Sequence, residues 1–394
     1  MEERMSIEQA VAAYLPLGQR ILDWMNAHPE VSGEEKQTVS FLVHLLKEQG
    51  LQVTSPIKRI KYSFLAKFPE NEHSHKPRVA ILCEYDAVAQ LGHSCGHSAS
   101  CAASIVCALA LQAAFSDLPF QIELIGTPNE EIAGGKIALL TKGVFDCYEF
   151  AALTQMGSQD QPCFQTLAAS DLIVHFYGKS AHTSVNPWEG INALNGVQLF
   201  FHAVDMLRPH LEPGSQVNGI IRDGGQIPNV IPNQASAYVY LRAQRYHQIL
   251  HLRQRIENCV RGAAIATENR FSTEQANPTY AEVFCGETAN EMICRIMEEL
   301  GLTPQLPTVV SGSSDVGNIS LAIPVFYPMI SIGQDAPLYS AEFAQHIQGA
   351  PGRLGMKNGA LVLTKMISYV AEHPDVLERI REEHTQYRNQ SEQG

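Results

Sequence analysis

The order of apolar and polar residues along the chain predicts two different styles of structure. In the first style, stretches with helical periodicity alternate with short apolar runs that are typical of buried strands. The helical stretches lie at 6–26, 33–49, 98–115 and 134–142, and the strand-like runs lie at 79–83 and 120–125. Strands that alternate with helices predict an α/β domain built on a parallel-type sheet.

The pattern changes after residue 167, and the first style returns near residue 277. Between these points the segments follow the order strand, helix, strand, strand, helix, at 170–177, 190–206, 216–221, 235–243 and 246–267. The first style resumes with two helices and an apolar strand, at 287–300, 354–373 and 325–331. The sequence therefore predicts one α/β domain, residues 1–167 and 277–394, interrupted by a ferredoxin-like α+β domain, residues 168–276.

Composition narrows the class of protein. The chain has 394 residues, of which 45% are apolar and 18% are charged, and its formal net charge is −13. A chain of this length can bury a large core, and its negative charge argues against nucleic acid or an anionic membrane as a partner. No stretch offers the ~18 consecutive apolar residues of a membrane span. The apolar stretch 99–115 is therefore interpreted as a buried helix.

The cysteines and the N-terminus predict a cytoplasmic protein. The nine cysteines are irregularly spaced, so we interpret most of them as buried free thiols in a reducing compartment. The segment Met1–Arg4 is polar and lacks the apolar core of a signal peptide.

Two short motifs carry the candidate chemistry. The stretch GHSCGH at 92–97 sets a thiol and an imidazole two positions apart, and GTPNEE at 126–131 ends in two adjacent carboxylates. Both follow predicted strands, where open α/β sheets bind ligands. Thiolate, imidazole and carboxylate suit Zn²⁺ or a similar ion, and a further carboxylate suits a general base. Either motif alone is typical of inert residues, whereas the pair favours a metal-hydrolase site.

Several longer motifs, in this order, make the chain resemble a known family. They are CGH at 95–97, GTPNEEIAGG at 126–135, GKSAH at 178–182, PWEGINAL at 187–194, PNVIPN at 228–233, LRA at 241–243 and GSSDVGN at 312–318. The chain resembles the clan MH metallopeptidases, in the aminoacylase and amidohydrolase family, and within it the branch of carnosine-dipeptidase-like and aminobenzoyl-glutamate-hydrolase-like enzymes. The resemblance implies a phosphorylase/hydrolase-like catalytic domain with a mixed central sheet, and an inserted lid that forms a homodimer.

The resemblance also implies a role for each matching residue. Cys95 corresponds to a thiolate that bridges two metal ions, and His97 and Glu131 correspond to ligands of the first and the second ion. Glu130 corresponds to the general base, and His182 on the lid corresponds to the donor that stabilises the oxyanion across a dimer. The remaining matches are the substrate-binding groups Asn229, Arg242, Gly312 and Ser313 and the residues that support the metal ligands, Asp86 and His93.

Two histidine ligands expected from the family are replaced. The one after the double-glutamate segment corresponds to Met156, and the one near the C-terminus corresponds to Tyr339. A thioether and a neutral phenol are weak ligands for Zn²⁺ or Mn²⁺. His346 lies near Tyr339, but the match at Glu342 and Phe343 sets the register against it, so we interpret His346 as a surface histidine. We therefore expect one Zn²⁺ or Mn²⁺ ion per chain, on the three remaining ligands, or none.

These residues favour an amide hydrolase that acts on a dipeptide or an N-acyl amino acid bearing a carboxylate. Two alternatives stay open. One is a metal-poor or metal-free enzyme with changed chemistry, such as biosynthetic amide formation, cyclisation or elimination. The other is a non-catalytic homologue that binds an amino-acid-like ligand, and retention of Glu130 and His182 counts against it.

Overall fold

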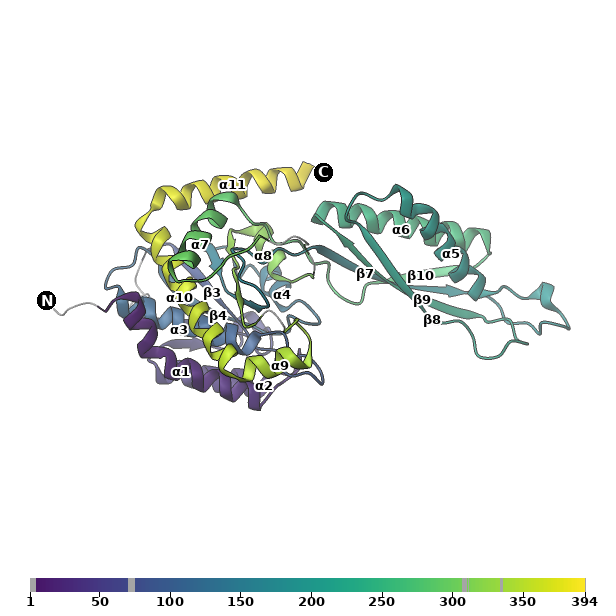
Figure 1. The fold of residues 1–394 in the computed structure, drawn as a ribbon. Coiled ribbons are helices and arrows are strands. Elements are labelled where there is room, and N and C mark those ends of the chain that lie inside the picture. Colours follow the sequence, from purple (N-terminus) through teal and green to yellow (C-terminus); the bar gives the residue numbers. More distant parts are fainter. Residues whose placement is uncertain (1–4, 70–74, 307–309, 311, 334–335, 394) are drawn as a thin grey trace. The chain divides into compact units, whose positions relative to one another are not determined.

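The structure, a computed structural model, describes residues 5–69, 75–306, 310, 312–333 and 336–393 (Figure 1). The chain divides into two compact units, the first made of Met1–Gln165 and Val283–Asn389 and the second made mainly of Thr166–Glu282. The sequence pattern set these boundaries at 167/168 and 276/277. The segment Met1–Arg4 lies outside the described residues.

A mixed sheet of six described strands forms the centre of the first unit. In spatial order the strands are β1 (Gln52–Thr54), β2 (Phe64–Lys67), β4 (Gln121–Thr127), β3 (Arg78–Glu84), β5 (Tyr148–Ala152) and β11 (Val325–Phe326). β3 pairs in parallel with β4 and β5, and β11 pairs in parallel with β5, whereas β2 joins β4 and β1 in antiparallel fashion. The predicted α/β class with a mixed central sheet is confirmed, and the carboxyl ends of β3, β4 and β5 meet at one edge.

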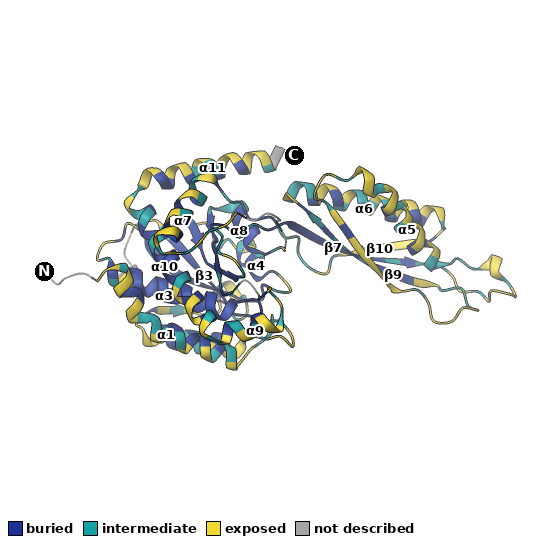
Figure 2. Cartoon of the chain, viewed as in Figure 1, coloured by how far each residue is buried: buried dark blue, intermediate teal, exposed yellow. Residues whose placement is uncertain are grey.

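Helices cover this sheet, and α3 lies in the middle of the core. The helices of the first unit are α1 (Ile7–Ala27), α2 (Lys36–Glu48), α3 (His97–Ala114), α4 (Gly135–Thr141), α7 (Glu287–Glu299), α8 (Val316–Ala322), α9 (Ala341–Gln348), α10 (Ala350–Glu372) and α11 (Pro374–Gln393). α1 and α10 pack against α3, which is buried along nearly its whole length (Figure 2). Within the described part of the chain, α3 is the helix long and apolar enough to span a membrane. Its packing confirms the prediction of a buried core helix.

The apolar run predicted as one strand at 325–331 is divided in two. β11 pairs with β5, whereas β12 (Met329–Ser331) pairs in parallel with β6 (Gln155–Gly157). Pro328 separates the two strands, and because proline has no N–H to donate to a ladder, it interrupts the pairing. The break brings β6 into a second small ladder that packs beside α3.

The second unit is an antiparallel sheet with two helices on one face (Figure 1). Its elements are β7 (Ala168–Tyr177), α5 (Ala193–Leu207), β8 (Gln216–Asp223), β9 (Gln234–Ala243), α6 (Tyr246–Ala266) and β10 (Arg270–Glu274), with strand order β10-β7-β9-β8. The sequence analysis missed β10, because every residue of this edge strand is exposed and no buried alternation marks it. The added strand completes the ferredoxin-like arrangement.

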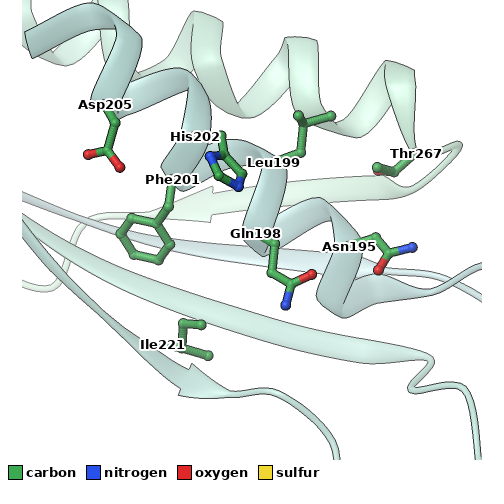
Figure 3. Close-up of a pocket in the computed structure, with 8 residues that line it drawn as sticks. All are labelled: Asn195, Gln198, Leu199, Phe201, His202, Asp205, Ile221 and Thr267. Carbon is green, nitrogen blue, oxygen red and sulfur yellow. The ribbon is translucent and has the colours of Figure 1, made fainter.

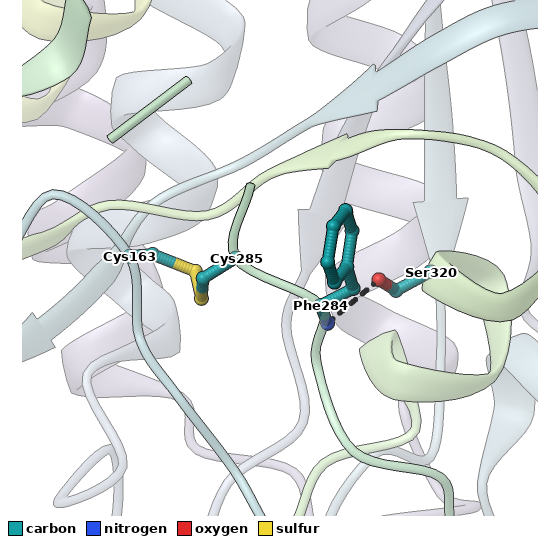
Figure 4. The surroundings of a disulfide bond; sticks show 4 residues. All are labelled: Cys163, Phe284, Cys285 and Ser320. Atoms are coloured by element: carbon teal, nitrogen blue, oxygen red, sulfur yellow. Dashed lines mark hydrogen bonds between the residues drawn. A yellow bond between two sulfur atoms is a disulfide. The ribbon is translucent and has the colours of Figure 1, made fainter. Parts of the chain in front are cut away.

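A disulfide joins the two chain segments that lead to and from the second unit. Cys163 and Cys285 both belong to the first unit and are separated by 122 positions in the sequence. Figure 4 shows the bond near Phe284, whose backbone N–H donates to Ser320 Oγ at 3.0 Å. The other cysteines are free, so the prediction of free thiols fails only for this pair, which lies close in space but far apart in sequence.

Candidate functional site

The loop after β3 brings the predicted thiol and imidazole to the edge of the sheet. Gly96 ends this loop with a left-handed backbone, φ +93°, and His97 is the first residue of α3. A Cβ atom on Gly96 would lie only 2.7 Å from Met156 Cβ. Glycine is therefore required at this position both for its backbone conformation and for the close approach of β6.

Cys95, His97 and Glu131 converge on one point. Each offers one ligand atom, and these atoms all lie within 4.8 Å of one another. His97 Nδ1 is 2.9 Å from the backbone oxygen of Asp86, which leaves Nε2 facing Glu131 Oε1 at 4.0 Å. An imidazole that donates through Nδ1 has its lone pair on Nε2, as a metal ligand requires. The donor set fits one Zn²⁺ or Mn²⁺ ion.

The charge at this site also fits a bound cation. Burial alone would lower the pKa of His97, but the negative charges of Cys95, Glu84 and Asp86 raise it well above its usual value. Burial raises the pKa of the Cys95 thiol to about 11, and the charge of His97 only partly opposes this shift. The surroundings therefore hold a positive charge at the imidazole, and a divalent ion would replace the protons of both groups.

Asp86 orients this cluster from behind. Its side chain accepts hydrogen bonds from Ser32 Oγ at 2.5 Å and from the Glu131 backbone N–H at 2.9 Å, and Oδ1 lies 3.2 Å from His97 Nδ1. Burial alone would raise the pKa of Asp86, but its contacts with His97 hold that pKa below its usual range. The carboxylate therefore stays ionised and ties the His97 ring to the Glu131 backbone. His93 is also buried, and burial together with the charge of His97 lowers its pKa to about 3.

A second buried cluster lies beside the first and contains the predicted general base. One oxygen from each of Glu84, Glu130 and Asp315 lies within 4.8 Å of the others. Burial and the charges of Glu131 and Asp315 raise the pKa of Glu130 well above its usual value. Burial raises the pKa of Asp315 to about 6, although Lys136 opposes this shift. A carboxyl group with a raised pKa suits proton transfer near neutral pH.

The sequence analysis assigned no role to several residues that build this site. Glu84 ends β3, and Lys136 begins α4 after Gly-Gly, so the signal available in the sequence was a charged residue beside a motif. Glu35 is fully buried, and its Oε1 accepts from the backbone N–H groups of Gly33 and Asn129 at 3.0 and 2.7 Å. Burial raises the pKa of Glu35 to about 7. Asn129 has φ +63° and directly precedes the general base, so Glu35 fixes the turn that presents it.

The two replaced ligands have different environments. Met156 is fully buried in the core, and a Cβ built on Gly355 of α10 would lie 3.2 Å from its Sδ. The neighbouring Gln155 donates to the backbone oxygen of Cys95 and accepts from Tyr327 Oη, both at 2.8 Å. Gln155, rather than Met156, therefore contacts the loop that carries the thiol. Tyr339 does lie at the cluster, because its hydroxyl donates to Glu131 Oε1 at 3.3 Å.

The predicted lid residues lie at opposite ends of the second unit. His182 forms a bridge with Val230, and its Nδ1 accepts from Ser184 Oγ at 3.1 Å, so it lies in the turn next to Asn229. Arg242 pairs in register with Ala169 near the far end of β9, where its guanidinium lies 5.2 Å from the Tyr240 ring centroid. From Gln234 to Arg242 the strand spans about 27 Å at about 3.4 Å per residue.

In the first unit, the predicted substrate groups Gly312 and Ser313 lie just before Asp315 of the acidic cluster. Gly312 is exposed with φ +79°, and Ser313 is partly buried. His346, which the sequence register set aside as a ligand, has its Nδ1 3.0 Å from the backbone oxygen of Ile332.

Known proteins similar to this chain agree with the motifs. Residues 169–268 match the M20 peptidase dimerisation domain. The chain is 32% identical over 332 residues to an Xaa-Arg dipeptidase of Mus musculus, which covers 82% of this chain and 77% of the relative. It is 30% identical over 284 residues to a p-aminobenzoyl-glutamate hydrolase chain of Escherichia coli K12, which covers 66% of this chain and 58% of the relative.

The fold also matches a solved structure. The YXEP protein of Bacillus subtilis, a dinuclear metal-binding peptidase from the M20 family, has a TM-score of 0.67 and 16% sequence identity. The match covers 91% of this chain and 99% of that chain, which shows that the two share the same fold.

Proposed function

This chain belongs to the M20 peptidase family of hydrolases, and we propose that it cleaves the amide bond of a dipeptide or an N-acyl amino acid with one divalent ion. The observation that carries the proposal is the convergence of Cys95, His97 and Glu131 beside the buried Glu130. The similar proteins support the reaction class, because their names describe a dipeptidase and a hydrolase of p-aminobenzoyl-glutamate.

The residues divide the reaction between them. An ion held by Cys95, His97 and Glu131 would polarise the scissile carbonyl and make water more acidic. Glu130 takes a proton from the attacking water and delivers it to the leaving amine, the role for which a buried carboxyl group with a raised pKa is suited. Tyr339 holds Glu131 in place through its hydrogen bond to Oε1.

The two lid residues point to a site shared between two chains. An extended dipeptide spans at most about 7 Å, whereas β9 separates the two ends of the lid by about 27 Å. Arg242 and His182 of one lid therefore cannot both contact one small substrate. If Arg242 binds the terminal carboxylate and His182 stabilises the oxyanion, the two residues come from different chains.

The surface of the second unit supports a homodimer. β8 is an edge strand, and its Ile220 and Ile221 are 61% and 48% exposed. Figure 3 shows Gln198 and Phe201 of α5 beside Ile221, in a groove that also includes Leu199. An exposed apolar edge strand is suited to pairing with the same strand of a second copy.

Subunit mixing tests both parts of the proposal. Glu130→Gln and His182→Ala should each inactivate hydrolysis of an Xaa-Arg dipeptide, while Arg242→Ala should mainly raise KM. Mixed dimers of the two inactive variants contain one site with an intact Glu130 and the partner's intact His182. Random mixing should restore about a quarter of wild-type activity. No recovery from dimers shown to be mixed would refute the shared site, and no hydrolysis by wild type with Zn²⁺ or Mn²⁺ would refute the reaction.

The dimer surface has its own test. Ile221→Lys should convert the dimer to a monomer in analytical ultracentrifugation, because it sets a charge in the edge-strand contact. Phe271→Lys, on the opposite edge strand β10, is the matched control and should leave the dimer intact. A dimer that survives the change at Ile221 but not the change at Phe271 would place the interface on β10.

A further inference from the structure

The acidic cluster beside the metal ligands requires a cation. Glu84, Glu130 and Asp315 have exposed fractions of 1%, 7% and 0%. Their carboxylate oxygens lie close enough together to hold a metal ion. Burying negative charges without a cation is very unfavourable, and clusters of this kind commonly bind a divalent ion.

In this chain, Lys136 lies at the cation position. Its Nζ is 2.7 Å from Glu84 Oε1 and 2.6 Å from Asp315 Oδ1, and its side chain is completely buried. Its backbone N–H donates to the other oxygen of Asp315 at 2.8 Å. A Zn²⁺ ion bound to carboxylate oxygens at about 2.0–2.2 Å would overlap the ammonium group. Two cations so close together in a buried site would also repel one another strongly.

The backbone around Lys136 fixes this arrangement. A Cβ atom on Gly135 would lie only 1.7 Å from the backbone oxygen of Pro128, so the start of α4 packs directly against the loop that carries Glu130. The Gly135 N–H donates to the Asn129 backbone oxygen at 3.0 Å and holds the same contact. Lys136 is therefore held between the ends of β3, α4 and the segment before α8, and does not lie on a flexible surface arm.

We infer that Lys136 is an internal cation that occupies the acidic cluster in place of a metal ion and leaves Cys95, His97 and Glu131 as the metal site of this chain. The inference rests on the proposed single-ion hydrolase and adds the reason for its metal content. Lys136 is a positioning residue: its ammonium holds Glu84 and Asp315 in fixed orientations next to Glu130. Glu84 in turn lies 3.6 Å from His97 Nε2, so the lysine also stabilises the wall of the metal site.

Metal content of Lys136→Met tests the inference. The variant keeps a long apolar side chain but removes the ammonium, so the three carboxylates should recruit an ion. After equilibration with Mn²⁺ and removal of excess metal, elemental analysis should find about one more equivalent per chain than in wild type. Lys136→Arg keeps the charge and is the matched control, with wild-type metal content. Adding Asp315→Asn to Lys136→Met should remove the extra ion again.

Each outcome decides the question. An unchanged metal content in folded Lys136→Met would refute the inference, and so would a loss of metal from the single variant Asp315→Asn, which would show that an ion already lies in the cluster. If Lys136→Met unfolds without metal, Mn²⁺ should raise its Tm, and the double variant should be insensitive to Mn²⁺. Failure of that rescue would also refute it. These measurements need no substrate, so absent hydrolysis would contradict the proposed function alone.

Discussion

Replacing Met156 by histidine separates the interpretation made from the sequence from the one made from the structure. The family register sets Met156 at the position of a missing metal ligand, and predicts that Met156→His would restore metal binding. In the structure this side chain is fully buried against α10, and its Sδ lies 3.2 Å from the Cβ position of Gly355. The structure therefore predicts that Met156→His adds no metal and destabilises the first unit.

The size of the loss follows from the burial of Met156. Removing a fully buried methionine side chain forfeits about 1.5–3 kcal/mol of transfer free energy. A buried imidazole nitrogen left without a hydrogen-bond partner costs about 1–3 kcal/mol more. The free energy of unfolding should therefore fall by about 3–6 kcal/mol, whereas Met156→Leu, which preserves volume and polarity, should cost less than about 1.5 kcal/mol.

Urea unfolding with and without chelator, together with elemental analysis, measures both quantities. Gln155→His is the informative companion variant, because its side chain lies against the backbone of Cys95 and can bring an imidazole to the metal ligands. We expect Gln155→His to raise metal affinity and Met156→His to leave it unchanged. A Met156→His protein of wild-type stability with an extra bound ion would show that our reasoning from the packing is wrong.

Three further predictions follow from single side chains. Glu130→Gln should lower kcat by at least ~10² without loss of bound metal, and a fully active variant would remove the general base. Because folding raises the pKa of Glu35 from 4.5 to about 7, its stabilising contribution is complete below pH 4.5 and is lost as pH rises to 7. In chelator, wild type should lose about 3 kcal/mol over that range by urea unfolding, and Glu35→Gln should abolish this slope. Cys163→Ser should lower stability by up to about 5 kcal/mol from the loop it opens, and by less if the second unit stays folded within the loop; an unchanged Tm under oxidising conditions would contradict it.

The sequence by itself determined the kind of fold and the chemistry of the site. Strand and helix periods differ and report burial of each local segment, so the α/β order, the buried α3 and the inserted unit were all predictable. The ligand types Cys95, His97 and Glu131 were predictable for the same reason, because short motifs set their spacing. Where local burial gave no pattern, as in the exposed strand β10, the sequence failed.

Only the tertiary structure decided which side chains meet and which way they face. Lys136 and Asp315 are separated by 179 positions, and the sheet topology brings them within 2.6 Å. Gln155 and Met156 are adjacent, but successive side chains of a strand point to opposite faces, so a shift of one position exchanges a site residue for a core residue. A motif match fixes residue identity along the chain but leaves this direction open. The contacts of α3, α10 and β6 fix it, because the apolar methionine gains most from burial in the core and the amide gains most from its hydrogen bonds at the site.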